Sequence, residues 1–124
     1  MQKAKLMNDA LSKWEVWLAN LEPVIGSEQG KTRPVIIISE AYTNDLLNVI
    51  NVLPITSRKN NRSIYPNEVL IPAGISGLSN ESIVLCYQIR TIDKRRLNKR
   101  YGILQDDVLK EEIIEALKFQ LGLL

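Results

Sequence analysis

The residues best suited to chemistry lie at positions 26–34, where two glycines, two cations, two hydroxyls and one carboxylate occur together. Arg33 and Pro34 close this segment, immediately before an apolar run at residues 35–38. A strand there would fix the arginine backbone and leave its planar guanidinium free to hold a phosphate by two parallel hydrogen bonds. The segment is not a nucleotide-binding P-loop, because it lacks the Gly-Lys-Ser/Thr ending. The alternative interpretation is a hairpin loop in which Arg33 forms a structural ion pair.

Positive charge is concentrated in two further segments. Residues 57–65 contain three cations and no acid, and residues 90–100 contain six cations against Asp93, a local balance of +5. Acids are concentrated instead in residues 106–115, which contain five acids and one cation, Lys110. Cationic runs of this kind either bind a polyanion such as a nucleic-acid backbone or form solvated turns, and both interpretations remain open.

Composition excludes several classes of catalytic site. The 124 residues include no histidine and one cysteine, Cys86, and the net charge of +2 neither requires nor forbids a nucleic-acid partner. Ser–His–Asp and Cys–His triads, histidine-dependent ribonuclease sites, His-containing zinc sites and an internal disulfide are therefore excluded. Glu111, Glu112 and Glu115 fall on one expected helix without other ligands, so we expect no metal site and no cofactor. Cys86 lies in an apolar run and is expected to be a core residue.

The size and composition indicate a single domain over residues 1–124, with an ordinary 45% of hydrophobic residues. Hydrophobic spacing predicts a short helix over residues 1–13 as an N-terminal extension, and strand-forming residues follow at 14–21. Trp14 and Trp17 lie in that strand. Packing in the domain or in a dimer is favoured for them over stacking on nucleobases.

The most apolar stretch predicts the centre of a sheet. Residues 34–39, with Pro34 first, are β-branched and apolar on both faces, as expected of a central buried strand. Residues 49–56 predict another strand. Its Pro54 should lie at an edge or a bulge, because proline cannot donate to a ladder. A polar stretch around residues 43–45 connects the two strands.

The second half of the chain predicts short strands and a closing helix. A mobile basic loop at residues 57–65 should precede strands at 67–72, at 82–89 continuing towards 92, and at 96–103. Asp106 and Asp107 are placed to cap a C-terminal helix. Its apolar face would hold Leu109, Ile113, Ile114, Leu117, Leu121 and Leu124. Short strands separated by turns and followed by one helix are typical of a small, partly open antiparallel barrel.

No stretch of the sequence approaches the ~18 apolar residues that span a membrane. The basic first five residues lack the apolar block of a secretory signal. We therefore expect a cytoplasmic protein with no membrane partner.

Three motifs follow one another along the chain. Residues 22–35 (EPVIGSEQGKTRPV), 53–57 (LPITS) and 88–97 (QIRTIDKRRL) resemble, in order, the three motifs of the MazF/PemK family of toxin endoribonucleases. The resemblance covers the chain from about Trp14 to the C-terminal helix. It implies an SH3-like β-barrel with a C-terminal helix, in agreement with the elements predicted above.

The resemblance also implies roles for individual residues. Arg33 and Thr56 match the principal catalytic groups, and Glu28 is the candidate base nearest in sequence, unless it pairs with Lys31 or Arg33. The first motif, the third motif and the basic segment together give the candidate RNA-binding residues. These are Ser27, Gln29, Lys31, Thr32, Ser57, Arg58, Lys59 and Gln88.

The implied activity is that of an mRNA interferase, a sequence-specific, metal-independent endoribonuclease that cleaves single-stranded RNA as the toxin of a type II toxin–antitoxin pair. Such a reaction suits a chain without histidine, because the RNA 2′-hydroxyl is itself the nucleophile and the protein must orient and stabilise the phosphate. Arg33 would act as a proton donor or an electrostatic clamp, since arginine stays protonated. Two alternatives remain: a toxin of the same barrel type that inhibits DNA gyrase by binding, and a non-catalytic RNA-binding barrel.

The resemblance implies two protein partners in addition to single-stranded RNA. The family forms homodimers that bind RNA in a groove across the two subunits. A cognate antitoxin is expected to place an acidic, largely disordered segment in the same groove and so exclude RNA.

Overall fold

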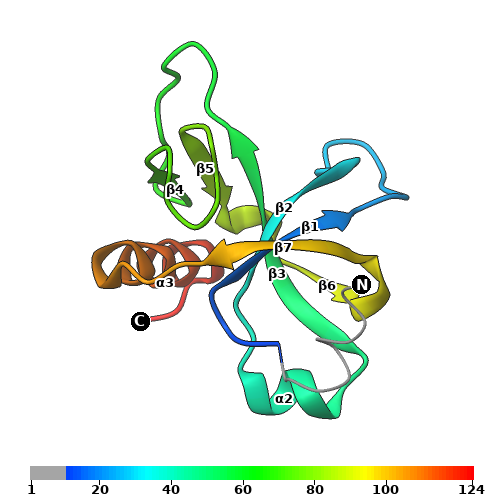
Figure 1. The fold of residues 1–124 in the computed structure, drawn as a ribbon. Helices are drawn as coiled ribbons and strands as arrows, with labels where there is room; N and C mark the ends of the chain where they lie inside the picture. Colours follow the sequence, from blue (N-terminus) through cyan, green and yellow to red (C-terminus); the bar gives the residue numbers. More distant parts are fainter. Residues whose placement is uncertain (1–10) are drawn as a thin grey trace.

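The computed structural model describes residues 11–124, whose strands form a curved antiparallel sheet that does not close on itself (Figure 1). The order is β4-β5-β3-β2-β1-β7, and β6 pairs with β3. The strands are β1 (Glu15–Asn20), β2 (Thr32–Ile37), β3 (Val49–Ser57), β4 (Glu68–Ile71), β5 (Ser82–Leu85), β6 (Arg90–Asp93) and β7 (Leu97–Ile103). The partly open antiparallel barrel predicted from the sequence is confirmed.

The C-terminal helix α3 (Asp107–Leu121) begins where its sequence predicts. The Asp106 side chain accepts a hydrogen bond from the Leu109 N–H at 3.0 Å, and Gly122, with φ of 69°, ends the helix in the left-handed conformation. The apolar face was predicted too long: Ile113 is buried, whereas Leu121 and Leu124 are exposed. No helix within residues 11–124 is long and apolar enough to cross a membrane.

A second helix, α2 (Ala41–Leu46), occupies the stretch that was predicted only to be polar. Its buried Asn44 explains why a polar sequence is ordered there. The Asn44 Nδ2 donates to the Leu11 carbonyl at 2.7 Å and to the Ser39 carbonyl at 2.9 Å, which ties the segment before β1 to the end of β2. Most of the helix predicted over residues 1–13 lies outside the described residues, and residues 11–13 are not helical.

Pro54 lies in the interior of β3, and the prediction that it occupies an edge or a bulge is wrong. On one side of β3, Pro54 pairs with Val35 of β2. The opposite edge pairs with β6 up to Val52 and with β5 from Ile55 onward. Pro54 therefore lies where that edge changes partner and where its missing N–H removes no ladder bond.

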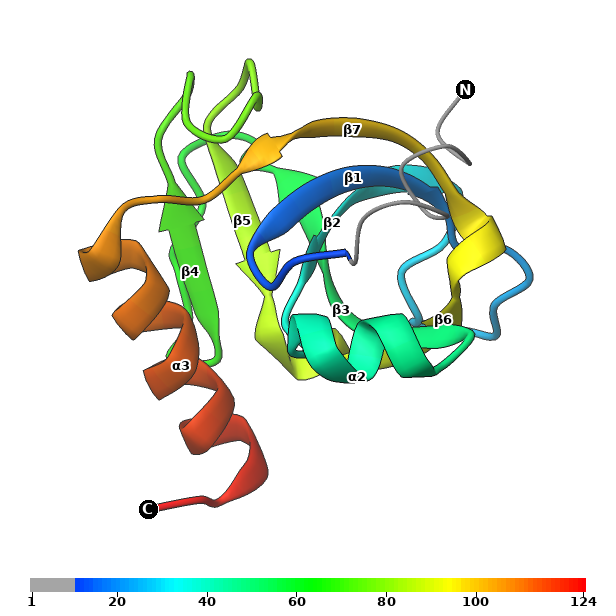
Figure 2. The ribbon, with the colours of Figure 1, turned by 60° about the horizontal axis from the view of Figure 1, so that its bottom comes forward.

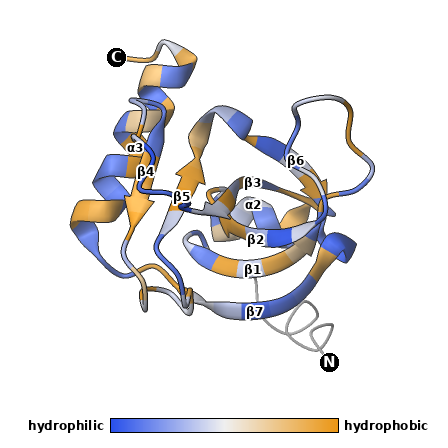
Figure 3. Cartoon of the chain, turned by 90° about the horizontal axis from the view of Figure 1, so that it is seen from above, coloured by the Kyte–Doolittle hydropathy of each residue, from blue (hydrophilic) through white to orange (hydrophobic). Residues whose placement is uncertain are grey.

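Both faces of the central strands are buried, because alternate residues enter two clusters of core side chains. One cluster joins the sheet to α3, and its members include Val16, Ile36, Leu53, Ile55, Ile113 and Ala116. The other is centred on the fully buried Trp17 and includes Val35, Ile37, Ile50 and Val52. Figure 2 shows α3 beside β4, with β5 on the other side of β4, and Figure 3 shows hydrophobic residues along β4 and β5. Trp17 is thus a core residue, unavailable for stacking on nucleobases.

The long strand predicted over residues 82–89 is interrupted. β5 ends at Leu85, and a 3₁₀ turn, η1 (Cys86–Gln88), precedes β6. Cys86 is fully buried in this turn, and burial raises the pKa of its thiol to about 12, so it stays protonated. The prediction of a core cysteine is confirmed. A second 3₁₀ turn, η2 (Lys94–Arg96), connects β6 to β7.

Candidate functional site

Strand register brings Arg33 and Thr56 to the same place. The ladder between β2 and β3 ends at the pair Val35–Pro54. Arg33 and Thr56 lie two residues beyond this pair, one on each strand. Thr56 pairs instead with Ile83 of β5, and Arg33 with Ala19 of β1. A pocket of about 380 Å³ lies where the ladder stops. It is lined by Arg33, Thr56, Ser57, Lys59 and Arg62.

This pocket, called the Arg33 pocket below, is cationic. Three of its described lining residues are cations and none is an acid. The Arg33 guanidinium is held by neutral oxygens: its Nε donates to the Gly30 carbonyl at 3.0 Å. With the Gln29 amide oxygen turned towards the guanidinium, that oxygen accepts from Nε at 2.8 Å and from Nη1 at 3.2 Å. The structural ion pair considered for Arg33 is not found among the described residues.

The loop that carries Gly30 and Lys31 folds around the side chain of Glu22. The Glu22 carboxylate accepts a hydrogen bond from the Lys31 N–H, and Lys31 has a φ of 63°. A Cβ on Gly30 would lie 2.4 Å from Glu22 Oε2 and 2.7 Å from Val24 Cγ2. A larger residue at position 30 would therefore have to displace the side chains of Glu22 and Val24. The Lys31 side chain is exposed on this loop, as is Thr32 at the start of β2.

Three residues of the first motif line a second pocket of about 560 Å³. Its lining residues are Ile25, Ser27, Glu28, Tyr87, Gln88, Ile89 and Arg90. Gln88 connects the two motifs, because its Oε1 accepts from the Gln29 N–H at 3.1 Å and its Nε2 donates to the Ser27 carbonyl at 3.0 Å. The η1 turn that interrupts the predicted strand places Gln88 there.

Glu28 does not lie with Thr56 in the Arg33 pocket. It lines the second pocket, and its Oε1 accepts from the Ile25 N–H at 2.7 Å, which closes a turn within the loop. The salt bridges considered between Glu28 and Lys31 or Arg33 do not occur among the described residues.

The basic loop after β3 is held by acids from other segments. Arg58 forms a salt bridge with Glu81 at 3.2 Å and donates to carbonyls of its own loop, so most of its donors are occupied. Arg62 forms a bidentate pair with Glu68. Among Ser57, Arg58 and Lys59, the RNA-binding residues predicted here, Ser57 and Lys59 are exposed and line the Arg33 pocket. Arg62 lines the Arg33 pocket and Arg90 lines the second pocket. The sequence indicated the cationic segments that contain them but did not single out either residue.

The cationic run at residues 90–100 mostly serves the fold. Arg90 donates to the Gln29 carbonyl at 3.3 Å, and Arg96 donates to the Asn20 and Glu22 carbonyls, so both hold the loop between β1 and β2. Arg95 pairs with Asp93 at 3.0 Å, and Arg100 pairs with the buried Glu15 at 3.3 Å. These four arginines are therefore not simply solvated, as the second interpretation expected, because each bonds another part of the chain.

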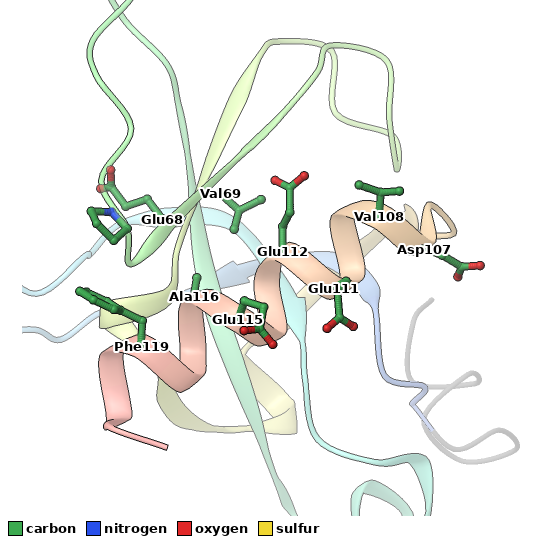
Figure 4. A pocket seen from close by; sticks show the side chains of 10 residues that line it. Glu68, Val69, Asp107, Val108, Glu111, Glu112, Glu115, Ala116 and Phe119 are labelled. Atoms are coloured by element: carbon green, nitrogen blue, oxygen red, sulfur yellow. The ribbon is translucent and has the colours of Figure 1, made fainter. Parts of the chain in front are cut away.

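A third pocket, of about 580 Å³, runs between β4 and α3 and has a different chemistry (Figure 4). Its lining includes Val69, Ala116 and Phe119, and no cation is among the described lining residues. Four acids of α3 line it, Asp107, Glu111, Glu112 and Glu115, together with the buried Glu68 that pairs with Arg62. A polyanion would be repelled there, so we place the candidate site at the two other pockets. Within residues 11–124, no group of acids and cysteines has an arrangement that could hold a metal ion.

Comparison with known proteins finds one family along nearly the whole chain. The model of the PemK-like, MazF-like toxin of type II toxin–antitoxin systems matches residues 12–121. The endoribonuclease MazF of Staphylococcus saprophyticus is 40% identical over 113 residues, which cover 91% of this chain and 92% of that protein. The crystal structure of MazF from Deinococcus radiodurans superimposes with a TM-score of 0.77 at 31% identity, covering 92% of this chain and 98% of that chain. A MazE–MazF complex from the same organism contains a chain with a TM-score of 0.69 at 31% identity, covering 91% and 96%.

Proposed function

Because this chain belongs to the PemK-like, MazF-like family of toxins of type II toxin–antitoxin systems, we propose that it is an endoribonuclease that cleaves single-stranded RNA. The observation that carries the proposal is the cationic pocket in which Arg33 and Thr56, from strands β2 and β3, lie together. RNA supplies its own nucleophile, so a site of this kind needs to provide orientation and positive charge rather than a nucleophilic side chain.

In the proposed reaction the ribose 2′-oxygen attacks the adjacent phosphorus, and the bond from phosphorus to the 5′-oxygen breaks. The products are a 2′,3′-cyclic phosphate and a 5′-hydroxyl, with one proton leaving the 2′-hydroxyl and one reaching the 5′-oxygen. Arg33, oriented by Gly30 and Gln29, donates hydrogen bonds to the phosphoryl oxygens as their charge grows. Thr56 donates its hydroxyl to the same phosphate, and Ser57 and Lys59 bind the flanking backbone.

Glu28 is the proposed acceptor of the 2′-hydroxyl proton. Its Oε1 is occupied by the Ile25 N–H, and its Oε2 makes no hydrogen bond with the described residues. The role requires RNA to extend from the Arg33 pocket into the second pocket, where Glu28 lies. That pocket, with Ser27, Gln29 and Gln88 at its edge, is also where we place recognition of the bases, and with it the sequence preference.

The decisive experiment incubates the purified protein with a long natural transcript in the presence of a metal chelator and maps the new ends. Cleavage at a recurrent short sequence, with cyclic phosphate and 5′-hydroxyl ends, is the expected result. Loss of cleavage in the chelator would contradict metal independence. RNA that is bound but left whole would indicate the non-catalytic barrel, and inhibition of gyrase on plasmid DNA without RNA cleavage would indicate the gyrase-binding alternative.

We also propose a cognate antitoxin, a homodimer and a cytoplasmic location. The D. radiodurans relative is found in a complex with MazE, and the cationic pocket here suits an acidic segment that competes with RNA. A ternary complex of the toxin, the antitoxin segment and an uncleavable RNA at one groove would contradict this competition. The RNA substrate places the reaction in the cytoplasm.

A further inference from the structure

Arg62 lines the Arg33 pocket although it lies on the loop between β3 and β4. Two of the three hydrogen-bonding edges of its guanidinium are occupied. Nη1 and Nη2 donate to the two oxygens of Glu68 at 2.9 and 2.8 Å, and Nη1 also donates to the Ser63 carbonyl at 2.8 Å. The third edge, formed by the Nε–H and the second Nη2–H, makes no hydrogen bond with the described residues. A pair of parallel donors therefore remains available on the arginine.

The orientation of this guanidinium is fixed by its surroundings. The Glu68 side chain is only 1% exposed, and its Oε1 also accepts from the Tyr65 N–H at 3.1 Å. Burial disfavours ionisation of Glu68, but the hydrogen bonds from Arg62 and from the Tyr65 backbone outweigh it and hold the pKa of Glu68 below its usual value. The Arg62 guanidinium also lies over the Tyr65 ring, 5.7 Å from its centre. The carboxylate and the ring together prevent Arg62 from turning away.

We propose that the free edge of Arg62 binds a phosphate of the RNA backbone adjacent to the phosphate held by Arg33, and that Glu68 is the positioning residue for this contact. The inference rests on the proposed function and deepens it. Two parallel N–H donors match two phosphoryl oxygens, and a guanidinium that is already oriented loses less conformational entropy on binding. Single-stranded RNA carries a phosphate at every nucleotide, so two fixed arginines in one pocket suit two phosphates of one strand.

Because Arg62 is paired with Glu68, its hydrogen bonds to a phosphate can be separated experimentally from the long-range electrostatic attraction of RNA. Arg62 and Glu68 together carry no net charge, so removing both charges leaves the long-range field of the site almost unchanged. If only that field mattered, the pair would be dispensable for RNA binding. A loss of binding on removing the pair therefore reports the hydrogen bonds of the free edge.

The test compares two double variants, one in the pocket and one control on the surface. Each variant removes one bidentate arginine–carboxylate pair. Arg62→Gln/Glu68→Gln removes the pair in the pocket. Asp93→Asn/Arg95→Gln removes a surface pair with contacts of 3.0 and 3.2 Å that lines neither the Arg33 pocket nor the second pocket. The ligand is an RNA with a 2′-deoxynucleotide at the mapped cleavage site, and affinity is measured over a range of salt concentrations.

We expect the pocket variant to bind RNA roughly tenfold more weakly, the usual value of a hydrogen bond to a charged group. The slope of log affinity against log salt should fall by about 0.7, as for one lost phosphate contact on a single strand. The control should keep the affinity and the slope of the parent. A purely structural role of the pair would lower the melting temperature and leave that slope unchanged.

The pocket variant overturns the proposal if it is folded and binds RNA with the affinity and salt slope of the parent. If it does not fold, Arg62→Lys decides, since lysine keeps the charge and a contact with Glu68 but lacks the second pair of donors. Weaker binding by folded Arg62→Lys supports the proposal, and parental binding overturns it. The proposal is also overturned if the Arg62→Gln/Glu68→Gln variant loses affinity only for an acidic antitoxin peptide and not for RNA. Failure of the parent to cleave RNA contradicts the proposed function instead.

Discussion

At the scale of a single residue, substitutions of Arg33 can show whether it acts through its positive charge or through the planar geometry of its guanidinium. If Arg33 only attracts RNA, Arg33→Lys keeps the cation and leaves cleavage nearly intact. If it clamps the phosphoryl oxygens, lysine cannot reproduce the planar contact that Gly30 and Gln29 orient. We expect the clamp, with a loss in cleavage rate on the order of 10²–10³ and little change in RNA affinity. Single-turnover cleavage and binding to uncleavable RNA measure the two quantities, and a rate close to the parental one would refute the clamp.

Thr56 is half-buried on β3, and its hydroxyl is the only part of the side chain that can donate to a phosphate. Thr56→Val keeps the shape and removes the donor, so cleavage should fall by a factor on the order of 10². Thr56→Ser keeps the donor and should retain part of the rate. Single-turnover kinetics on one substrate compare them. Equal rates for the valine and serine variants would show that Thr56 acts by packing alone.

At the scale of elements, the loop between β1 and β2 depends on the close approach of Glu22 to Gly30. In Gly30→Ala the new Cβ would meet Glu22 Oε2 and Val24 Cγ2, so these side chains must shift, which disturbs the hydrogen bond from the Lys31 N–H to Glu22 close to Arg33. We expect cleavage to fall at least about tenfold, because a small displacement at a catalytic group is costly. Gly74→Ala is the control: Gly74 has φ of 88° but open space around it, so its substitution should lower the melting temperature and spare cleavage. The reverse pattern would contradict this explanation of the loop.

The sequence predicted the elements whose signals are local and missed the features set by long-range pairing. Runs of strand-forming residues and a helix cap predicted β1, β2, β4, β7 and α3. The motifs predicted that Arg33 and Thr56 share a site, but not that Arg62 lines it or that Glu28 lies in the second pocket. The interior place of Pro54 depends on the exchange of β6 for β5 along one edge of β3, which no local pattern reports. The Asn44 amide that organises α2 bonds the Leu11 carbonyl, and Arg58 pairs with Glu81, so these contacts also join segments that are far apart in the sequence.

The whole molecule should lose stability in acid partly through Glu68. The pKa of Glu68 is lowered in the folded state by its bonds to Arg62, so the stabilisation it provides is complete above the unfolded value of 4.5 and is lost as pH falls below it. Urea unfolding at a series of pH values should show the unfolding free energy of the parent dropping more steeply below pH 4.5 than that of Glu68→Gln. Parallel curves for the two proteins would contradict the assignment.

The molecule as a whole is also expected to be a homodimer, but not through Trp17. Trp17 is fully buried in the chain itself. One group of exposed apolar residues lies on and after α3, where Phe119 is 64% and Leu123 60% exposed. A symmetric pair would cover this surface and duplicate the cationic pockets. Sedimentation at micromolar concentration should give twice the 14.1 kDa of the chain. Phe119→Asp should weaken the dimer roughly thirtyfold or more, whereas Tyr42→Asp, at a 75% exposed aromatic on α2, should not. A parent that sediments only as a monomer, or a dimer indifferent to Phe119→Asp, would show that α3 is not the interface.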